Sequence, residues 1–279
     1  MALELGICSY SFHLALAAGK QDMFKYIEDC KALGATQYDP WNAHFTELRS
    51  GDDIKKSGQF EITPQEDEYL ERVKAAAAKA GLPCGCIAVD GAHMYEPTPE
   101  AVAANRQLRY RWLEIAKKLG AKQLRLDAGG TKEMPEDQFQ VMVPEYKDIV
   151  ARGKTAGVEI IMENHWGASN IPENVVKILD AIPGLGLLFD SNNWAQGTQE
   201  RGWELCAKYA KVTHIKTFQF NADGYDPSVN LPKAIKLLVD TGYKGCWTVE
   251  SCPKDGDEYG AVTKTFNLIR KELGKLNYS

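Results

Sequence analysis

The stretch V-E-I-I-M-E, at residues 158–163, is a short apolar run that ends in a carboxylate. Three more runs in the second half of the chain also end in a polar residue: L-G-L-L-F-D (185–190), K-V-T-H (211–214) and C-W-T-V-E (246–250). Four separate strand-like segments can bring such ends together only if they lie side by side in one parallel sheet. The runs therefore predict both a fold and a site at the carboxyl ends of its strands.

Strand-like and helix-like segments alternate along the whole chain of 279 residues. Segments of helical periodicity, such as 65–80, 100–119 and 258–273, separate the strand-like runs. Eight candidate strands begin near Leu3, Thr36, Cys84, Lys122, Val158, Leu185, Lys211 and Cys246. No compositional break divides the chain, so the pattern predicts an α/β fold, a single (β/α)8 TIM barrel domain over residues 1–279. A doubly wound sheet is the alternative, but it more often has a glycine-rich turn where this chain has S-Y-S-F-H.

Helix boundaries are also legible in the sequence. Thr63 and Glu66 are spaced as a capping box, with Pro64 at the first helical position. Gly81 and Gly157 each follow a helical segment, where a left-handed residue commonly ends a helix. These signals predict a helix that begins after residue 63 and ends before residue 81.

The interval between the second and third candidate strands is the longest, and it contains the polar segment Asn42–Ile62, which has no clear periodicity. An insertion at the carboxyl end of a barrel strand is commonly a lid or rim loop over a site. A plain surface excursion explains it equally well, so its role stays open.

Composition narrows the functional classes. The net charge is −5, without a stripe of Lys and Arg, which disfavours nucleic-acid partners. No apolar run approaches 18 residues, so we expect no membrane partner, and the N-terminus lacks the features of a signal peptide, so we expect a cytoplasmic protein. Seven scattered cysteines indicate neither a disulfide framework nor a structural zinc site.

Side-chain parity supports a shared site for the four strand ends. Glu163 is on the same face of its strand as Ile161, and Glu250 is on the face of Thr248. The equivalent apolar neighbours are Leu188 for Asp190 and Val212 for His214. Three carboxylates and one imidazole suit a divalent cation that keeps open positions for a substrate. The alternative is that these residues cap helices or pair with Lys and Arg.

The motifs around these residues resemble the xylose isomerase-like barrel superfamily. They are Glu163 in I-M-E-N-H, Asp190 in L-L-F-D-S-N-N, His214 in T-H-I-K-T and Glu250 in T-V-E-S. Their intervals of 27, 24 and 36 positions are similar to those of its sugar phosphate isomerase/epimerase family, which includes ketose 3-epimerases. The resemblance implies that the four residues hold one divalent metal ion and that Glu163 and Glu250 also act as acid and base. Manganese is the expected ion, with magnesium, cobalt and zinc as alternatives.

Two positions depart from the epimerase pattern. Asn193 and Lys216 stand where the epimerases often carry histidine, and both are expected to contact the substrate. The alternative for Lys216 is a rim lysine that pairs with a carboxylate. His165 and Arg125 have the parity of the site, and Trp41 and Trp166 follow strands and could stack on a sugar. The simpler interpretation of Arg125 is that it pairs with Asp127, which ends the same strand. These residues complete the predicted substrate-binding set. Three further histidines, His13, His44 and His93, follow the first three strands and could line the mouth.

The predicted function is a divalent-metal-dependent isomerase or epimerase that acts on a sugar or keto-sugar. A carboxylate would remove a C–H proton, and the metal would stabilise the resulting enediolate. The loops after the last two strands, N-A-D-G-Y-D and K-D-G-D-E, are acidic, which favours a non-phosphorylated substrate. A metal-dependent lyase or dehydratase on a 3-keto sugar or related hydroxy-ketone is the first alternative. A non-catalytic, sugar-binding barrel subunit is the second. A barrel flank could also pair into a homo-oligomer.

Overall fold

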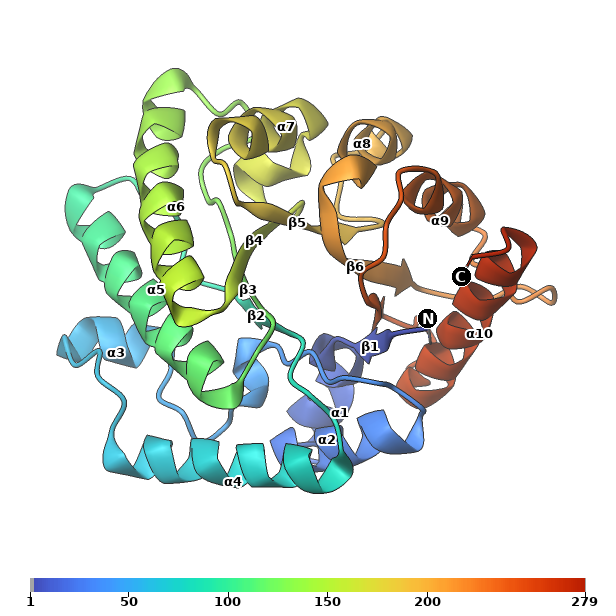
Figure 1. Cartoon of the computed structure of the whole chain (residues 1–279), viewed down its shortest axis with the longest axis horizontal. Coiled ribbons are helices and arrows are strands. Elements are labelled where there is room, and N and C mark those ends of the chain that lie inside the picture. The colour runs from blue at the N-terminus through green and yellow to red at the C-terminus, as the bar shows by residue number, and fades with distance from the viewer. Residues whose placement is uncertain (1–2, 279) are drawn as a thin grey trace.

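Seven parallel strands form one curled sheet in the computed structural model, which describes residues 3–278 (Figure 1). The strands are β1 (Leu5–Ile7), β2 (Cys86–Val89), β3 (Gln123–Leu126), β4 (Glu159–Glu163), β5 (Gly186–Asp190), β6 (Ala210–Thr217) and β7 (Trp247–Ser251). Their order is β1-β7-β6-β5-β4-β3-β2, and each neighbouring pair is parallel. The fold is a TIM barrel, as predicted. All seven carboxyl ends therefore meet at one mouth.

The predicted second strand, near residues 36–41, is not a regular strand, but it occupies the eighth position of the barrel. Its backbone bonds to both neighbours: Asp39 N donates to Ile7 O at 3.3 Å, and Ala88 N donates to Pro40 O at 2.9 Å. Isolated bridges pair Cys8 with Asp39 and Trp41 with Ala88. Pro40 has no N–H to donate, which interrupts the ladder. The segment thus closes the barrel between β1 and β2 without regular strand geometry.

Ten α-helices surround this sheet within the described residues (Figure 1). They are α1 (His13–Ala17), α2 (Met23–Ala32), α3 (Gly51–Ser57), α4 (Pro64–Ala80), α5 (Pro99–Leu119), α6 (Glu136–Ala156), α7 (Pro172–Ala181), α8 (Gln199–Cys206), α9 (Leu231–Asp240) and α10 (Glu258–Lys275). The predicted capping box of Thr63 and Glu66 is present, and Gly81 ends α4 with a φ of 68°. Both helix-boundary predictions are confirmed.

The barrel interior has its own small apolar cluster, separate from the large core. Its members are Cys86, Ile161, Leu188, Val212 and Cys246. Three of them lie two residues before Glu163, Asp190 and His214, and Cys246 lies four before Glu250, so the parity prediction is confirmed. The apolar cluster forms the floor, and the polar strand ends lie above it.

The Asn42–Ile62 segment packs on the barrel flank. Arg49 donates to Glu66 of α4 through both Nε and Nη2 at 3.1 Å, and its Nη2 also reaches Glu61 O. Gly51 faces Leu108 of α5. These contacts fix the body of the insertion against α4 and α5, which agrees with a surface excursion.

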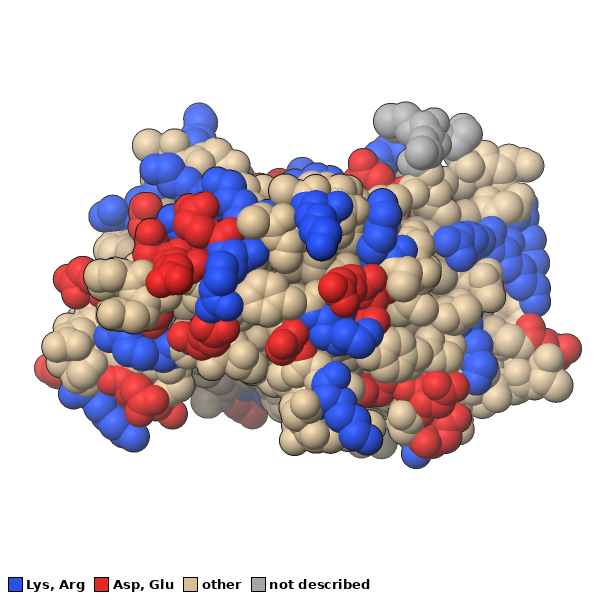
Figure 2. Space-filling model, turned by 90° about the horizontal axis from the view of Figure 1, so that it is seen from below, with Lys and Arg blue, Asp and Glu red and all other residues tan. Residues whose placement is uncertain are grey.

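The surface carries mixed charge. Figure 2 shows acidic and basic side chains interspersed over the face seen from below. No helix within residues 3–278 has the length and apolar character needed to cross a membrane.

Asp39 ties the irregular segment to the barrel interior. Its carboxylate accepts hydrogen bonds from Cys86 N, Thr248 Oγ1 and Gln37 Nε2, each at 2.7 Å. We expect Asp39→Ala to lower the free energy of unfolding by about 4 kcal/mol, because three buried donors would lose their acceptor. Urea unfolding measures this loss. Asp39→Asn keeps one oxygen and should lose clearly less; an equal loss in both variants would contradict the role of the hydrogen bonds.

His44 does not line the mouth but is buried against Tyr26, with ring centroids 5.4 Å apart. Burial lowers its pKa to about 4, and Asp22 opposes that shift only weakly. The unfolded chain takes up a proton below about pH 6.5. The contribution of the neutral ring to stability is therefore complete above that pH and is lost as the pH falls toward 4.

We expect His44 to cost the protein about 2 kcal/mol of stability between about pH 7 and about pH 5. The measurement is the free energy of unfolding at both pH values for the wild type and for His44→Leu. The difference between the two proteins should change by this amount in favour of the variant at the lower pH. Parallel profiles would show that His44 does not titrate in this way.

Candidate metal centre

The four polar strand ends converge on the His214 ring. His214 Nδ1 lies 2.8 Å from Glu250 Oε2, 3.4 Å from Glu163 Oε1 and 4.0 Å from Asp190 Oδ2. One ligand atom from each residue lies within 4.8 Å of the others, and all four residues are buried. They come from β4, β5, β6 and β7, which are consecutive in the sheet. The sequence-predicted quartet is therefore brought together at the barrel mouth.

Several atoms of this quartet that could bind a metal ion have no hydrogen-bond partner within the described residues. Glu163 Oε2, Asp190 Oδ2 and His214 Nδ1 are all buried and unpaired in this sense. Unsatisfied buried polar atoms are costly, so these atoms call for a further partner, although Glu163 Oε2 also lies 3.0 Å from Arg125 Nε. Three oxygen donors and one nitrogen match what a divalent cation such as manganese, magnesium, cobalt or zinc accepts. The residues present fit a metal ion.

Lys216 and Asn193, the two departures from the epimerase pattern, contact each other. Lys216 Nζ donates to Asn193 Oδ1 at 3.1 Å, and Asn193 Nδ2 donates to Glu163 Oε1 at 3.2 Å. Lys216 also forms an ion pair with Glu250 and lies 3.7 Å from Asp190 Oδ2. The two residues thus form one unit that links three carboxylates of the quartet.

Arg125 lies on the other side of Glu163. Its Nε is 3.0 Å from Glu163 Oε2, although not in a hydrogen-bonding direction. Its Nη1 donates to Asp127 Oδ2 and Asp90 Oδ1, both at 2.8 Å. His165 Nδ1 lies 3.3 Å from Asp127 Oδ1. Arg125 pairs with Asp127, as the simpler interpretation of the sequence expected, and it contacts the quartet as well.

The protein charges shift the pKa values of the quartet in different directions. Burial raises the pKa of Asp190 to about 6, because nearby Glu250 and Glu163 add to the effect and Lys216 offsets only part of it. Burial would also raise the pKa of Glu163 and Glu250, but Arg125 lowers the first, and Lys216 and His214 lower the second. Burial would lower the pKa of His214, yet Cys8 and the two glutamates raise it. The site favours positive charge at its centre.

A cleft of about 680 Å3 opens above the quartet. Its wall includes all six residues predicted to bind substrate: His165, Lys216, Asn193, Arg125, Trp41 and Trp166. Glu250 also reaches its surface. Of the three histidines expected at the mouth, none is part of this wall: His13 stacks on Tyr10, His93 lies beside Glu96, and His44 is in the core. Their positions after the strands did not reveal that their side chains lie outside the wall of the cleft.

Asp90 is a wall residue that the sequence interpretation missed. It accepts hydrogen bonds from Arg125 and from Trp41 Nε1, the latter at 2.8 Å. It follows the apolar run I-A-V (87–89), which is the same signal that identified the quartet. Tyr10, in S-Y-S-F, and Cys8 also line the cleft.

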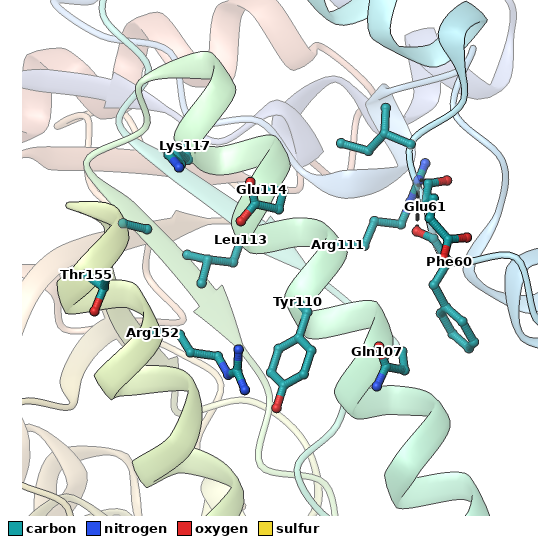
Figure 3. A pocket seen from close by; sticks show the side chains of 12 residues that line it. Phe60, Glu61, Gln107, Tyr110, Arg111, Leu113, Glu114, Lys117, Arg152 and Thr155 are labelled. Atoms are coloured by element: carbon teal, nitrogen blue, oxygen red, sulfur yellow. Dashed lines mark hydrogen bonds between the residues drawn. The ribbon is translucent and has the colours of Figure 1, made fainter.

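A second hollow, of about 710 Å3, lies on the barrel flank between α5, α6 and residues 60–62 (Figure 3). Its arginines already have partners. Arg111 pairs with Glu66 at 2.7 Å, and Arg152 pairs with Asp148 at 3.1 Å and stacks on the Tyr110 ring. The barrel mouth has buried ligand atoms without hydrogen-bond partners, whereas the arginines of the flank hollow are already paired. The barrel mouth is therefore the candidate site.

Comparisons with known proteins support the same fold family. The family model described as xylose isomerase-like TIM barrel matches residues 27–271. Among solved structures, the chain is similar to D-allulose 3-epimerase from Methylomonas sp. in complex with D-allulose (TM-score 0.73, 14% identity, 97% of each chain covered). It is also similar to the IOLI protein with a zinc atom (0.70, 14%, 98% of this chain and 99% of that one). A probable 3-DHS dehydratase from Bacillus anthracis matches as well (0.68, 13%, 95% and 99%). No curated protein matches the sequence.

Proposed function

Because the chain belongs to the xylose isomerase-like TIM barrel family, we propose that it is a divalent-metal-dependent isomerase or epimerase of a non-phosphorylated sugar or keto-sugar. The observation that carries this proposal is the convergence of three carboxylates and one imidazole with unpaired donor atoms. Glu163, Asp190, His214 and Glu250 would hold the ion. Bound there, a divalent cation would act as a Lewis acid on a carbonyl and lower the cost of removing the adjacent C–H proton.

Glu163 and Glu250 are suited to move protons on opposite sides of a substrate. They lie on β4 and β7, and therefore flank Asp190 of β5 and His214 of β6 in the sheet. One carboxylate can take a C–H proton from one face, and the other can return it to the opposite face, which inverts a stereocentre. Return to the neighbouring carbon instead converts an aldose into a ketose.

Arg125 and Asn193 would hold Glu163 in place during this exchange, since each contacts a different oxygen of that carboxylate. His165, whose ring is oriented by Asp127, would contact a substrate hydroxyl. Similarity to an epimerase whose solved structure contains D-allulose supports a small carbohydrate as the substrate.

Lys216 supports a second candidate, a lyase or dehydratase at the same site. Burial would lower its pKa, but Glu250 and Asp190 raise it well above the usual value, so the side chain is cationic. Lys216 also lines the cleft, where it could protonate a departing oxygen after the C–H proton is removed. One structurally similar protein is described as a probable 3-DHS dehydratase, which is an enzyme of this reaction class.

The deciding experiment is an NMR assay in deuterated water. A panel of aldoses, ketoses and 3-keto sugars is incubated with protein loaded with manganese, magnesium, cobalt or zinc. Deuterium in recovered substrate and in an epimer or isomer supports the leading proposal. An unsaturated product supports the lyase. No reaction and no exchange with any metal would contradict both and favour a non-catalytic sugar-binding barrel.

A further inference from the structure

Half of the barrel mouth is not occupied by the quartet. Glu163, Asp190, His214 and Glu250 come from β4 to β7, which are four of the eight positions around the barrel. The remaining positions are β1, residues 36–41, β2 and β3. The cleft extends over both halves, with Tyr10, Trp41 and Asp90 on the second one.

An aromatic wall is already assembled on that second half. Trp41 is held by two hydrogen bonds: its backbone N–H donates to Ser9 Oγ, and its Nε1 donates to Asp90 Oδ2, both at 2.8 Å. Tyr10 lies edge-on to the Trp41 ring at 5.0 Å and stacks on His13 at 4.5 Å. The rings are thus fixed without a ligand. A sugar ring above the quartet would have its apolar C–H face against this wall.

Trp166 is on the opposite side of the mouth and farther from the floor. It lies three residues beyond the end of β4, and β4 is four barrel positions from β1. The residue is 66% exposed, the highest value among the large exposed apolar residues described, and its ring centroid lies 4.6 Å from that of His165. Asn170 and Asn192 line the same side of the cleft. An exposed tryptophan beside amide side chains is a suitable platform for a polar ring.

The size of the cleft fits more than one ring. Its volume of about 680 Å3 is in the middle of the range of clefts that bind drug-sized ligands, roughly 300–1,000 Å3. Because the Trp41 wall and Trp166 follow barrel positions on opposite sides of the mouth, we expect a single hexose beside the Trp41 wall to leave Trp166 uncovered.

We propose that the mouth has a second sugar subsite at Trp166, so that the substrate is a glycoside or disaccharide. The reacting ring lies between the quartet and the Trp41–Tyr10 wall, and the second pyranose ring stacks on Trp166. This inference rests on the proposed function for the identity of the reacting ring. Trp41 contributes to the binding of either kind of sugar, whereas Trp166 contributes only when a second ring is present.

The test is equilibrium binding, measured by titration calorimetry on the metal-supplemented full-length protein. The probes are D-glucose and four glucose disaccharides: trehalose, maltose, cellobiose and gentiobiose. We expect at least one disaccharide to bind about tenfold more tightly than glucose. Trp166→Ala should reduce that advantage to about twofold or less, while Trp166→Tyr, which keeps an aromatic face, should retain most of it. Trp41→Ala should weaken both sugars.

Two results would overturn the subsite. One is that all five sugars bind within about twofold of one another or fail to bind; the other is that Trp166→Ala weakens glucose and disaccharide equally. Circular dichroism of each variant establishes that it is folded. Failure of the proposed reaction is distinguishable, because it would leave the disaccharide preference and its dependence on Trp166 intact while the NMR assay shows no exchange.

Discussion

Glu163→Gln and Glu250→Gln are each expected to lower the rate of solvent-deuterium incorporation into a sugar substrate by about 10³-fold. Glutamine keeps the shape of the side chain but removes both its charge and its ability to accept a proton. Each glutamate also supplies an oxygen to the quartet, so the same substitution weakens the proposed metal site. The measurement is the initial rate of exchange, followed by proton NMR at saturating metal.

Glu159→Gln is the matched control for this pair. Glu159 starts β4, the same strand that ends in Glu163, and its carboxylate accepts a hydrogen bond from Gln123 at 3.0 Å at the opposite end of the barrel. The control should exchange deuterium at the wild-type rate. Equal losses in Glu159→Gln and Glu163→Gln would indicate a general effect on folding. Unchanged rates in both site variants would mean that these glutamates are not the acid and base.

Removal of the metal is expected to destabilise the protein. A ligand that binds only the folded state stabilises it by about 4 kcal/mol when its concentration is 1,000 times the dissociation constant. We expect a strong stabilisation by metal here, because the quartet places three carboxylates around one imidazole. Carboxylate oxygens and the imidazole nitrogen of the quartet have no hydrogen-bond partner. Thermal and urea unfolding of chelator-treated and metal-supplemented protein measure the difference. Asp190→Asn should remove most of it.

Asp127→Asn is the control that separates the quartet from the neighbouring cluster of Asp90, Asp127 and His165. Those three residues also lie within metal-binding reach of one another. However, both oxygens of Asp90 accept hydrogen bonds, from Arg125 and Trp41, and the two oxygens of Asp127 contact Arg125 and His165. The carboxylate oxygens of this cluster therefore already have partners, unlike two oxygens of the quartet. The metal-dependent stabilisation should therefore persist in Asp127→Asn. Its loss in this variant, with retention in Asp190→Asn, would place the ion in the wrong cluster for the proposed mechanism.

The sequence was informative where the backbone is regular. The register shift between β5 and β6 lies before Leu188 and Val212. Beyond it the side chains of β4 to β7 alternate regularly, so the positions of Glu163 and Asp190 on the inner face followed from counting residues. At residues 36–41 the prediction of a regular strand failed. Pro40 interrupts the hydrogen-bond ladder there, and the Asp39 carboxylate fills the barrel interior. The room for Asp39 comes from Gly6 and Gly85, where a Cβ would lie within 2.1 Å of its carboxylate oxygens.

Contacts that involve residues after the strands could not be predicted by counting residues. Lys216 and Asn193 are 23 residues apart, and only the packing of β5 beside β6 shows that they bond to each other. His44 follows the second barrel position, as His165 follows β4, yet one is in the core and the other in the cleft. The local backbone after each strand decides which way such a side chain turns, and residue spacing does not encode it.

Anomalous X-ray diffraction from crystals soaked in manganese locates the ion directly. We expect one strong peak between Glu163, Asp190, His214 and Glu250, and no peak at this position in crystals of Asp190→Asn. A peak at Asp90, Asp127 and His165 instead, or an empty quartet at a manganese concentration that supports activity, would contradict the proposed metal site.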